Sequence, residues 1–425
     1  MKITCTSQKL FLLLFIMLLS VLCACQKEIE NSKSPSGDNR KAASMLLKSG
    51  IKHLEERDLL SARRDLESAA RLNPEDPGIF VALGDVYDEL YLLKEAEAAF
   101  RTAISLSPKN PEAHWAFGMI FYQMDKYRQA ENALKTALRL DTACSKAYYD
   151  LGHIYLRQGK ISEAEKAYKN SIKIGPDNPC AYIGMGEFLI YRGRLDEAKK
   201  ILDMALVVNE KAIKDGKTKS EEGHIRTALA KVLVEKKDFE NAEKQAYLAI
   251  KADPGVAGSY YVMGELKRDT GNLDESASWL EKAIKINPYD ISFFVTLADI
   301  ETRRNRMKRA EELYKKAMSM NPQEKQTLHS IQLGLGEIAL SGKDYKNAKD
   351  RLEHAWRLVP ESSKANYLLA EAYAALEKEG SCRKILTGLA KRDPGRIEKA
   401  FRDPAFEKYH NENWFKNLLP EDDNN

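Results

Sequence analysis

The sequence predicts an all-α protein built by repeating one helix–turn–helix unit. A chain of 425 residues is longer than a single compact core, which usually stops growing near roughly 250–300 residues, so several domains or a repeat must account for its length. Prolines recur at multiples of 34 residues, apart from excesses of 10 and 4 residues, and this period is typical of a helix–turn–helix array. They are Pro74, Pro108, Pro176, Pro254, Pro288, Pro322, Pro360 and Pro394.

Small residues recur in the same register. With each of these prolines at position 32, ten repeats begin at residues 43, 77, 111, 145, 179, 223, 257, 291, 329 and 363. Position 8 then holds glycine or alanine, and position 20 holds alanine, serine or cysteine, in all ten repeats. Small residues allow the two helices of a repeat to approach closely, whereas a larger side chain would overpack the contact by roughly 1–3 kcal/mol. In repeat 3 these residues are Gly118 and Ala130.

Large residues fill the complementary positions, such as position 24 with Phe100, Tyr168, Leu202, Leu280 and Tyr314. The whole pattern resembles the tetratricopeptide repeat over residues 43–396. The resemblance implies a right-handed superhelical solenoid of about ten repeats, in which stacked neighbours share one continuous core.

Departures from the period mark the expected boundaries. Repeats 1–5 occupy residues 43–212, and repeats 6–10 occupy residues 223–396. Between them, residues 213–222 are expected to lengthen the second helix of repeat 5 and to form a mobile charged loop; a tolerated surface insertion is the simpler alternative. Residues 397–425 are expected to cap the array, because they keep large apolar residues that can cover its last repeat. These are Phe401, Phe406, Trp414, Phe415, Leu418 and Leu419.

The N-terminus is expected to be a processing signal over residues 1–24. Two lysines precede a run of 15 residues from Leu10 to Ala24 that is apolar except for Ser20, and this run is shorter than the roughly 20 residues of a membrane span. Its end, Leu22-Cys23-Ala24-Cys25, resembles a bacterial lipobox. The resemblance implies a lipoprotein with lipid on Cys25, followed by a polar tether over residues 25–42. An uncleaved signal anchor is the alternative.

The resemblance also suggests a location. Gln26 stands where an aspartate would signal retention in the inner membrane of enteric bacteria, so the outer membrane, facing the periplasm, is expected. The formal net charge is +4, and two of the positive charges lie in the segment expected to be removed, which leaves +2. Such a balance does not favour nucleic-acid binding.

Catalytic and metal-binding motifs are not evident. Beyond the signal and Cys25, three scattered cysteines remain, Cys144, Cys180 and Cys382, without histidines at metal-ligand spacing. The segment Gly334–Ala339 fits a weak dinucleotide pattern, but it lies within the expected first helix of repeat 9 instead of following a strand. We therefore expect no cofactor, no metal and no enzymatic activity.

The first helices of the repeats are the expected binding surface, since in the resembled family ligands lie along them. Four aromatic residues at position 5 and six carboxylates at position 9 are the candidates, and they favour a peptide with apolar anchors and basic residues. A common repeat background is the alternative explanation. The candidates are Trp115, Tyr149, Tyr261 and Tyr367 with Asp85, Glu187, Glu265, Asp299, Glu337 and Glu371. The neighbouring position-4 residues Tyr148 and Tyr260 are expected to pack inward.

The function expected from this pattern is a scaffold for protein–protein interaction, lipid-anchored in the cell envelope. The resemblance suggests a role in assembly, secretion or envelope biogenesis. The alternative is a factor that binds peptidoglycan or polysaccharide in the concave groove. The pattern does not indicate the partner or the oligomeric state.

Overall fold

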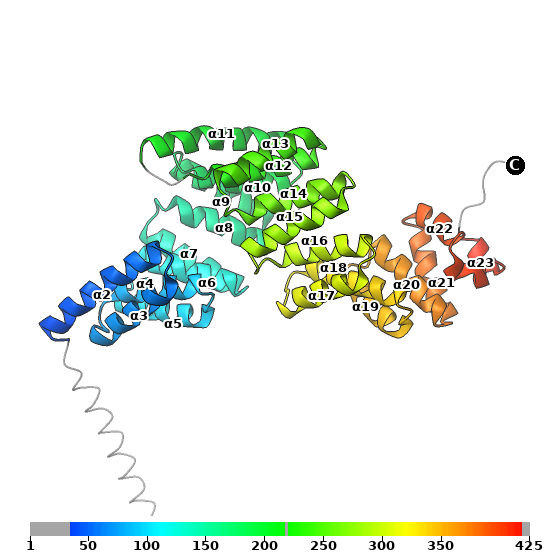
Figure 1. Cartoon of the computed structure of the whole chain (residues 1–425), viewed down its shortest axis with the longest axis horizontal. Helices are drawn as coiled ribbons and strands as arrows, with labels where there is room; N and C mark the ends of the chain where they lie inside the picture. Colours follow the sequence, from blue (N-terminus) through cyan, green and yellow to red (C-terminus); the bar gives the residue numbers. More distant parts are fainter. Residues whose placement is uncertain (1–34, 217–219, 419–425) are drawn as a thin grey trace, which may run out of the picture. The chain divides into compact units, whose positions relative to one another are not determined.

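The computed structural model describes residues 35–216 and 220–418, and all regular elements in these two ranges are helices (Figure 1). The all-α prediction is therefore confirmed. The chain divides into two compact units, residues 1–175 and 176–425, and each is described by itself. Within the described ranges, no helix combines the length and the apolar character that crossing a membrane requires.

The first unit consists of four helical hairpins, and the two helices of each hairpin pack against one another. Each hairpin is one of the predicted repeats 1–4. Its helices are α2 (Gly37–Glu55), α3 (Leu59–Leu72), α4 (Pro77–Glu89), α5 (Leu93–Leu106), α6 (Pro111–Gln123), α7 (Tyr127–Leu140), α8 (Ser145–Arg157) and α9 (Ile161–Ile174).

The second unit contains six further hairpins, repeats 5–10, and a C-terminal segment of short helices. Its hairpin helices are α10 (Pro179–Tyr191), α11 (Leu195–Lys214), α12 (Glu222–Glu235), α13 (Phe239–Ala252), α14 (Ala257–Asp269), α15 (Leu273–Ile286), α16 (Ile291–Arg303), α17 (Met307–Ser319), α18 (Lys325–Ser341), α19 (Tyr345–Leu358), α20 (Ser363–Ala375) and α21 (Glu379–Ala390). The C-terminal segment contains α22 (Pro394–Ala400), the 3₁₀ helix η1 (Pro404–Tyr409) and α23 (Asn413–Lys416).

The close contact predicted within each repeat is present, but its main partner differs from the expectation. A methyl group added to Gly84 would lie 2.5 Å from the ring of Phe100, which occupies position 24. In repeat 3, a methyl group on Gly118 would lie 3.1 Å from Leu134 and 3.3 Å from the backbone oxygen of Ala130. Position 8 is therefore small mainly to admit the side chain at position 24, and position 20 contributes its backbone.

The turn inside each repeat has a shared geometry that the sequence pattern did not indicate. Position 15 has a positive φ, between 56° and 84°, in all ten repeats. Only three of these residues are glycines, although a left-handed backbone costs roughly 1–2 kcal/mol for other L-residues. The ten residues are Arg57, Tyr91, Asp125, Gly159, Gly193, Lys237, Gly271, Asn305, Lys343 and Glu377.

Within each unit, stacking buries one side of a first helix against the preceding repeat. In repeat 2, Ile79 at position 3 and Val86 at position 10 are fully buried and belong to the same cluster as Leu66 of repeat 1. In repeat 1, the same two positions hold Met45, which is 74% exposed, and the exposed Lys52. The first repeat thus carries a mainly polar outer side, as terminal repeats of a solenoid require.

Two helices begin earlier than expected. Helix α2 begins at Gly37, inside the tether predicted over residues 25–42, because Ser36 caps it by accepting a hydrogen bond from the backbone N–H of Asn39 at 3.2 Å. Helix α18 begins at Lys325 instead of residue 329, and so takes up the four extra residues of the proline spacing.

The insertion between repeats 5 and 6 is partly helical. As expected, α11 is long, with 20 residues against 14 in α13. It takes in Ile213 and ends at Lys214, and the chain leaves the helix through Gly216, which has a φ of 66°. Glu222 already belongs to α12. The loop predicted over residues 213–222 is therefore shorter than expected, because helices occupy both of its ends. Residues 217–219 lie outside the described residues.

The C-terminal segment packs on repeat 10. Phe406 and Phe415 are fully buried in one cluster with Leu386 of α21, and the rings of Phe401 and Phe415 lie 4.6 Å apart. This packing covers the apolar side of the last repeat. Leu419, also expected in the cap, lies outside the described residues.

Candidate partner-binding face

The predicted binding residues lie on the first helices of the repeats, and we call this surface the first-helix face. In the first unit it is formed by α4, α6 and α8, and in the second unit by α10, α12, α14, α16, α18 and α20. Of the four predicted aromatic residues, Trp115, Tyr149 and Tyr261 are half-buried, whereas Tyr367 is only 3% exposed.

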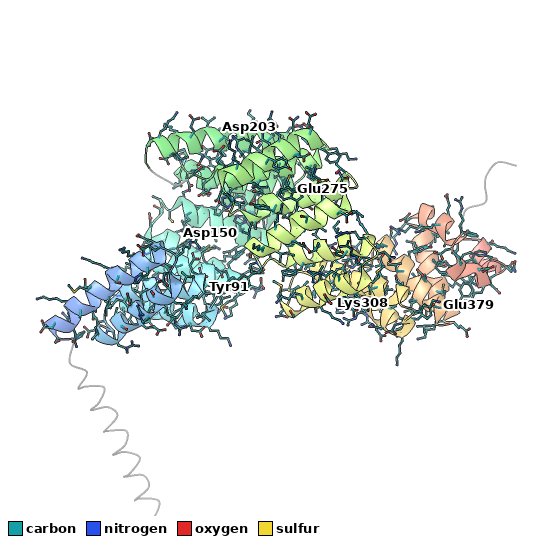
Figure 2. All side chains as sticks on the ribbon, in the orientation of Figure 1. Tyr91, Asp150, Asp203, Glu275, Lys308 and Glu379 are labelled. Atoms are coloured by element: carbon teal, nitrogen blue, oxygen red, sulfur yellow. The ribbon has the colours of Figure 1, made fainter. Side chains whose placement is uncertain are left out.

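Trp115 is held by residues of the next repeat. Its indole N–H donates a hydrogen bond of 2.6 Å to Asp150 of α8, a residue labelled in Figure 2 and only 6% exposed. The ammonium group of Lys146 lies 3.3 Å from the centroid of the Trp115 ring. Burial raises the pKa of the Asp150 carboxyl to about 6, although the indole and Lys146 both favour its charged form.

Asp85 of α4 lies among other acids. Burial, together with the charges of Glu112 and Asp88, raises the pKa of the Asp85 carboxyl to about 7, and Lys146 opposes this shift. Asp88 accepts a hydrogen bond of 2.7 Å from Gln123, which belongs to the next first helix. No cation in the described part of the chain forms an ion pair with Asp85, and Lys146 offsets the charge of its carboxylate only in part.

Tyr149 belongs to a group of rings. It packs edge-on against His153 at 4.6 Å, and His153 packs edge-on against the buried Tyr168 at 5.5 Å. The predicted difference between positions 4 and 5 does not appear in exposure, because Tyr148 and Tyr260 are half-buried like their position-5 neighbours. Tyr260 packs on the apolar cluster that contains Phe293, as Tyr261 does, so inward packing is not confined to position 4.

In the second unit, Tyr261 of α14 is bonded on several sides. Its hydroxyl lies 3.2 Å from Glu265 and 3.2 Å from the hydroxyl of Thr296, and its ring stacks on Phe293 at 5.1 Å. Burial raises the pKa of the Glu265 carboxyl, and the Arg268 guanidinium, 3.5 Å away, opposes this effect.

Three of the other predicted carboxylates of the second unit have a partner or a nearby cation. Glu337 forms an ion pair of 2.6 Å with Lys364 of the next repeat. Asp299 is exposed and accepts a hydrogen bond from the hydroxyl of Tyr314. Burial raises the pKa of Glu371, an effect that Lys399 opposes. Glu187 is half-buried on α10.

Tyr367 does not line the first-helix face as predicted. Its hydroxyl donates a hydrogen bond of 2.5 Å to Asp403, and its ring packs against Phe406 at 5.7 Å. Both partners belong to the C-terminal segment, because η1 packs on α20 where the first helix of another repeat would otherwise lie. A partner could contact this ring only by displacing the C-terminal segment.

Three residues missed by the sequence analysis hold these aromatic side chains. Asp150, Thr296 and Asp403 bond to position-5 aromatic residues 35, 35 and 36 positions before them. The available signal was a polar residue about one repeat after each aromatic residue. That signal can be used only once the repeat register is known.

A hollow lies at the end of the first-helix face, between α20 and η1. Repeat 9 contributes Tyr345 to its wall, and Glu371 and Glu407 contribute carboxylates. The ammonium group of Lys408, which also lines the hollow, is bonded to the backbone oxygen of Ala374 at 2.5 Å.

Comparison with known protein families identifies the chain. A model described as the cilia and flagella-associated protein 70 C-terminal domain matches residues 24–259, more than half of the chain, which therefore belongs to that family. Two tetratricopeptide repeat models match residues 257–290, 291–324 and 339–400. The chain is a tetratricopeptide repeat protein. This confirms the resemblance inferred from the 34-residue period.

Individual relatives of this tetratricopeptide repeat protein are distant. Human protein O-mannosyl-transferase TMTC1 is 27% identical over 158 residues, which are 36% of this chain and only 17% of that protein. A tetratricopeptide repeat protein from Parabacteroides merdae is 18% identical, with a TM-score of 0.49 over 60% of this chain and 98% of its own. MamA is 29% identical, with a TM-score of 0.34 over 39% of this chain and 96% of its own. PilF of Pseudomonas aeruginosa is 16% identical, with a TM-score of 0.38 over 63% of this chain and 99% of its own.

The first-helix face offers half-buried aromatic rings, carboxylates and a few cations. The three described cysteines are free thiols, and burial raises the pKa of Cys382 to about 12, which suppresses the thiolate that reactivity requires. Cys25, the predicted lipidation site, lies outside the described residues.

Proposed function

We propose that this protein is a non-catalytic interaction scaffold that binds a segment of another protein along its first-helix face. The observation that supports this best is the first unit's combination of half-buried Trp115 and Tyr149 with Asp85, a half-buried acid that has no ion-pair partner among the described residues. Aromatic residues dominate binding energies at interfaces, and a half-buried acid without an ion-pair partner favours a ligand that supplies a cation.

The partner segment would carry apolar side chains next to lysine or arginine. The apolar side chains would pack against Tyr149 and the edge of Trp115, and the cation would approach Asp85 and Glu112. This contact would offset the mutual repulsion of the two acids, which belong to successive first helices.

A glycan ligand is less favoured by the geometry. Sugar rings would need to stack on an open aromatic face, and the Lys146 ammonium already lies 3.3 Å from the centroid of the Trp115 ring. A pull-down from envelope extract with the full-length protein separates the two cases. We expect a protein to be retained and released by salt, and retention of glycan in its place would contradict the proposal.

We also propose that the protein is a lipoprotein anchored through Cys25 to the periplasmic side of the outer membrane, with a role in assembly, secretion or envelope biogenesis. The support is the Leu22-Cys23-Ala24-Cys25 ending after a short apolar run. Replacing Cys25 by serine should release the protein from the membrane fraction and stop its processing. A variant that remains processed and equally membrane-bound would contradict the anchor.

A further inference from the structure

The outer side of α2 carries a stripe that we call the end face, formed by Lys41, Met45, Lys48 and Lys52. Their spacing of four, three and four residues places them on one side of the helix, and all four are exposed. In repeat 2, the positions equivalent to Met45 and Lys52 are fully buried against repeat 1. In repeat 1 no preceding repeat covers them among the described residues.

The middle of the end face is basic and largely unpaired, and the exposed acids Asp38 and Glu55 continue the same spacing at its two ends. Neither Lys41 nor Lys48 has an acidic partner within the described ranges. Lys52 approaches Glu56 at 3.7 Å, but both side chains are more than half exposed, and such surface pairs contribute little. Met45 adds an apolar side chain, 74% exposed, in the middle of the stripe.

The end face lies close to Cys25 along the chain. Helix α2 begins at Gly37, twelve residues after that cysteine. A fully extended chain spans at most about 3.5 Å per residue, so the start of α2 stays within roughly 40 Å of Cys25. If Cys25 carries the lipid anchor, the end face is kept next to the bilayer at a high effective concentration.

We propose that the end face docks on the anionic lipid headgroups of the membrane that holds the anchor. The inference rests on the proposed lipidation of Cys25. Charge complementarity and the short tether are the further arguments for it. Three lysines meet the negative surface, and Met45 enters the boundary between headgroups and acyl chains. The first repeat is thereby fixed against the membrane, and the first-helix face has a defined starting point relative to it.

The test uses the lipidated protein in vesicles of phosphatidylcholine alone or mixed with phosphatidylglycerol. Acylation of each lysine is followed by mass spectrometry. With phosphatidylglycerol present, Lys41, Lys48 and Lys52 should react several-fold more slowly, and high salt should restore their reactivity. Equal reactivity in the two kinds of vesicle would overturn the proposal.

Paired variants show whether the end face itself is responsible. Each lysine contributes about 1 kcal/mol near an anionic surface, or about fivefold, so Lys41→Gln with Lys48→Gln should weaken docking about 25-fold and expose Lys52 to acylation. The control pair Lys94→Gln with Lys166→Gln changes the charge equally at exposed sites on the second helices of repeats 2 and 4. If the control pair exposes Lys52 to acylation equally, a general effect of net charge explains the result and the proposal is wrong.

Failure of the anchor can be distinguished from failure of the end face. The intact mass first shows whether Cys25 carries lipid. If it does not, a histidine tag at residue 25 holds the chain on the same vesicles through a nickel-chelating lipid, and acylation is measured again. Protection of the three lysines there supports the end face without the natural anchor, and its absence contradicts the end face directly.

Discussion

The first-helix faces of the two units carry similar residues at the same repeat positions but balance their charges differently. In the first unit, Asp85 faces other acids and no cation pairs with it. In the second unit, Glu337 pairs with Lys364, and Glu265 approaches Arg268. An acid at position 9 thus lacks an ion-pair partner among the described residues in the first unit, at Asp85, whereas in the second unit Glu337 and Glu265 have one. Repeat position alone does not decide which role a carboxylate takes.

The largest expected effects come from overpacking each unit separately. Ala130→Leu in repeat 3 and Ala310→Leu in repeat 8 both place a large side chain at a fully buried position 20, and each should cost roughly 1–3 kcal/mol. Hydrogen exchange should show lost protection in repeats 2–4 and repeats 7–9, respectively. Ala98→Leu, at an exposed site on α5, is the control. Protection that falls equally along the chain would contradict the assigned register.

A second comparison concerns the donors at position 5. Trp115→Phe removes the hydrogen bond to the buried Asp150, and an unsatisfied buried acceptor costs about 1–3 kcal/mol. Tyr261→Phe removes a hydroxyl whose partners are only half-buried, so it should cost less. Thermal unfolding of both variants measures the difference. A larger loss for Tyr261→Phe would show that the half-buried bonds matter more.

The raised pKa of Asp85 predicts a pH dependence of stability. Its folded pKa, about 7, lies above the ordinary value of 3.8, so the folded state favours the protonated acid and stability falls as pH rises through that interval. Asp85→Asn should therefore stabilise the protein above pH 7, by on the order of 1 kcal/mol, and flatten this dependence. Glu337→Gln is the matched control, because it breaks an ion pair and should not stabilise. Equal responses of the two variants would remove the distinction between the units.

The smallest expected effect concerns the turns within repeats. Tyr91 has a backbone φ of 60°, and its side chain is half exposed. Tyr91→Gly should relieve the strain of this backbone conformation and stabilise the first unit by about 0.5–1 kcal/mol. Asn305→Gly should gain less in the second unit, because asparagine tolerates this conformation better. Chemical denaturation measures both. Destabilisation by Tyr91→Gly would mean that the ring makes contacts worth more than the strain.

The repeat fold could be predicted from the sequence because its determinants are local. Gly84 and Phe100 lie 16 residues apart and meet inside one hairpin, so the same pair of sizes recurs every 34 residues. The left-handed turn at position 15 was missed because seven of its ten residues are not glycine, so no residue type marks it.

The binding face was less predictable because its geometry depends on neighbours without a fixed residue type. The burial of Tyr367 follows from the path of a C-terminal segment that has no repeat period. The early start of α2 depends on a single serine cap in an otherwise polar segment. The pairing of Glu337 with Lys364 requires both the register and the stacking of two repeats.

The central claim is that a partner binds the first-helix face of the first unit. The most direct measurement is a calorimetric titration of the captured partner with the parent protein, Tyr149→Ala, and the control Tyr247→Ala, whose ring is 49% exposed on the second helix α13. Tyr149→Ala should weaken binding about thirtyfold, the effect of losing a hot-spot aromatic of about 2 kcal/mol, while the control keeps parental affinity. Unchanged affinity for Tyr149→Ala, with its helical circular dichroism intact, would contradict the account.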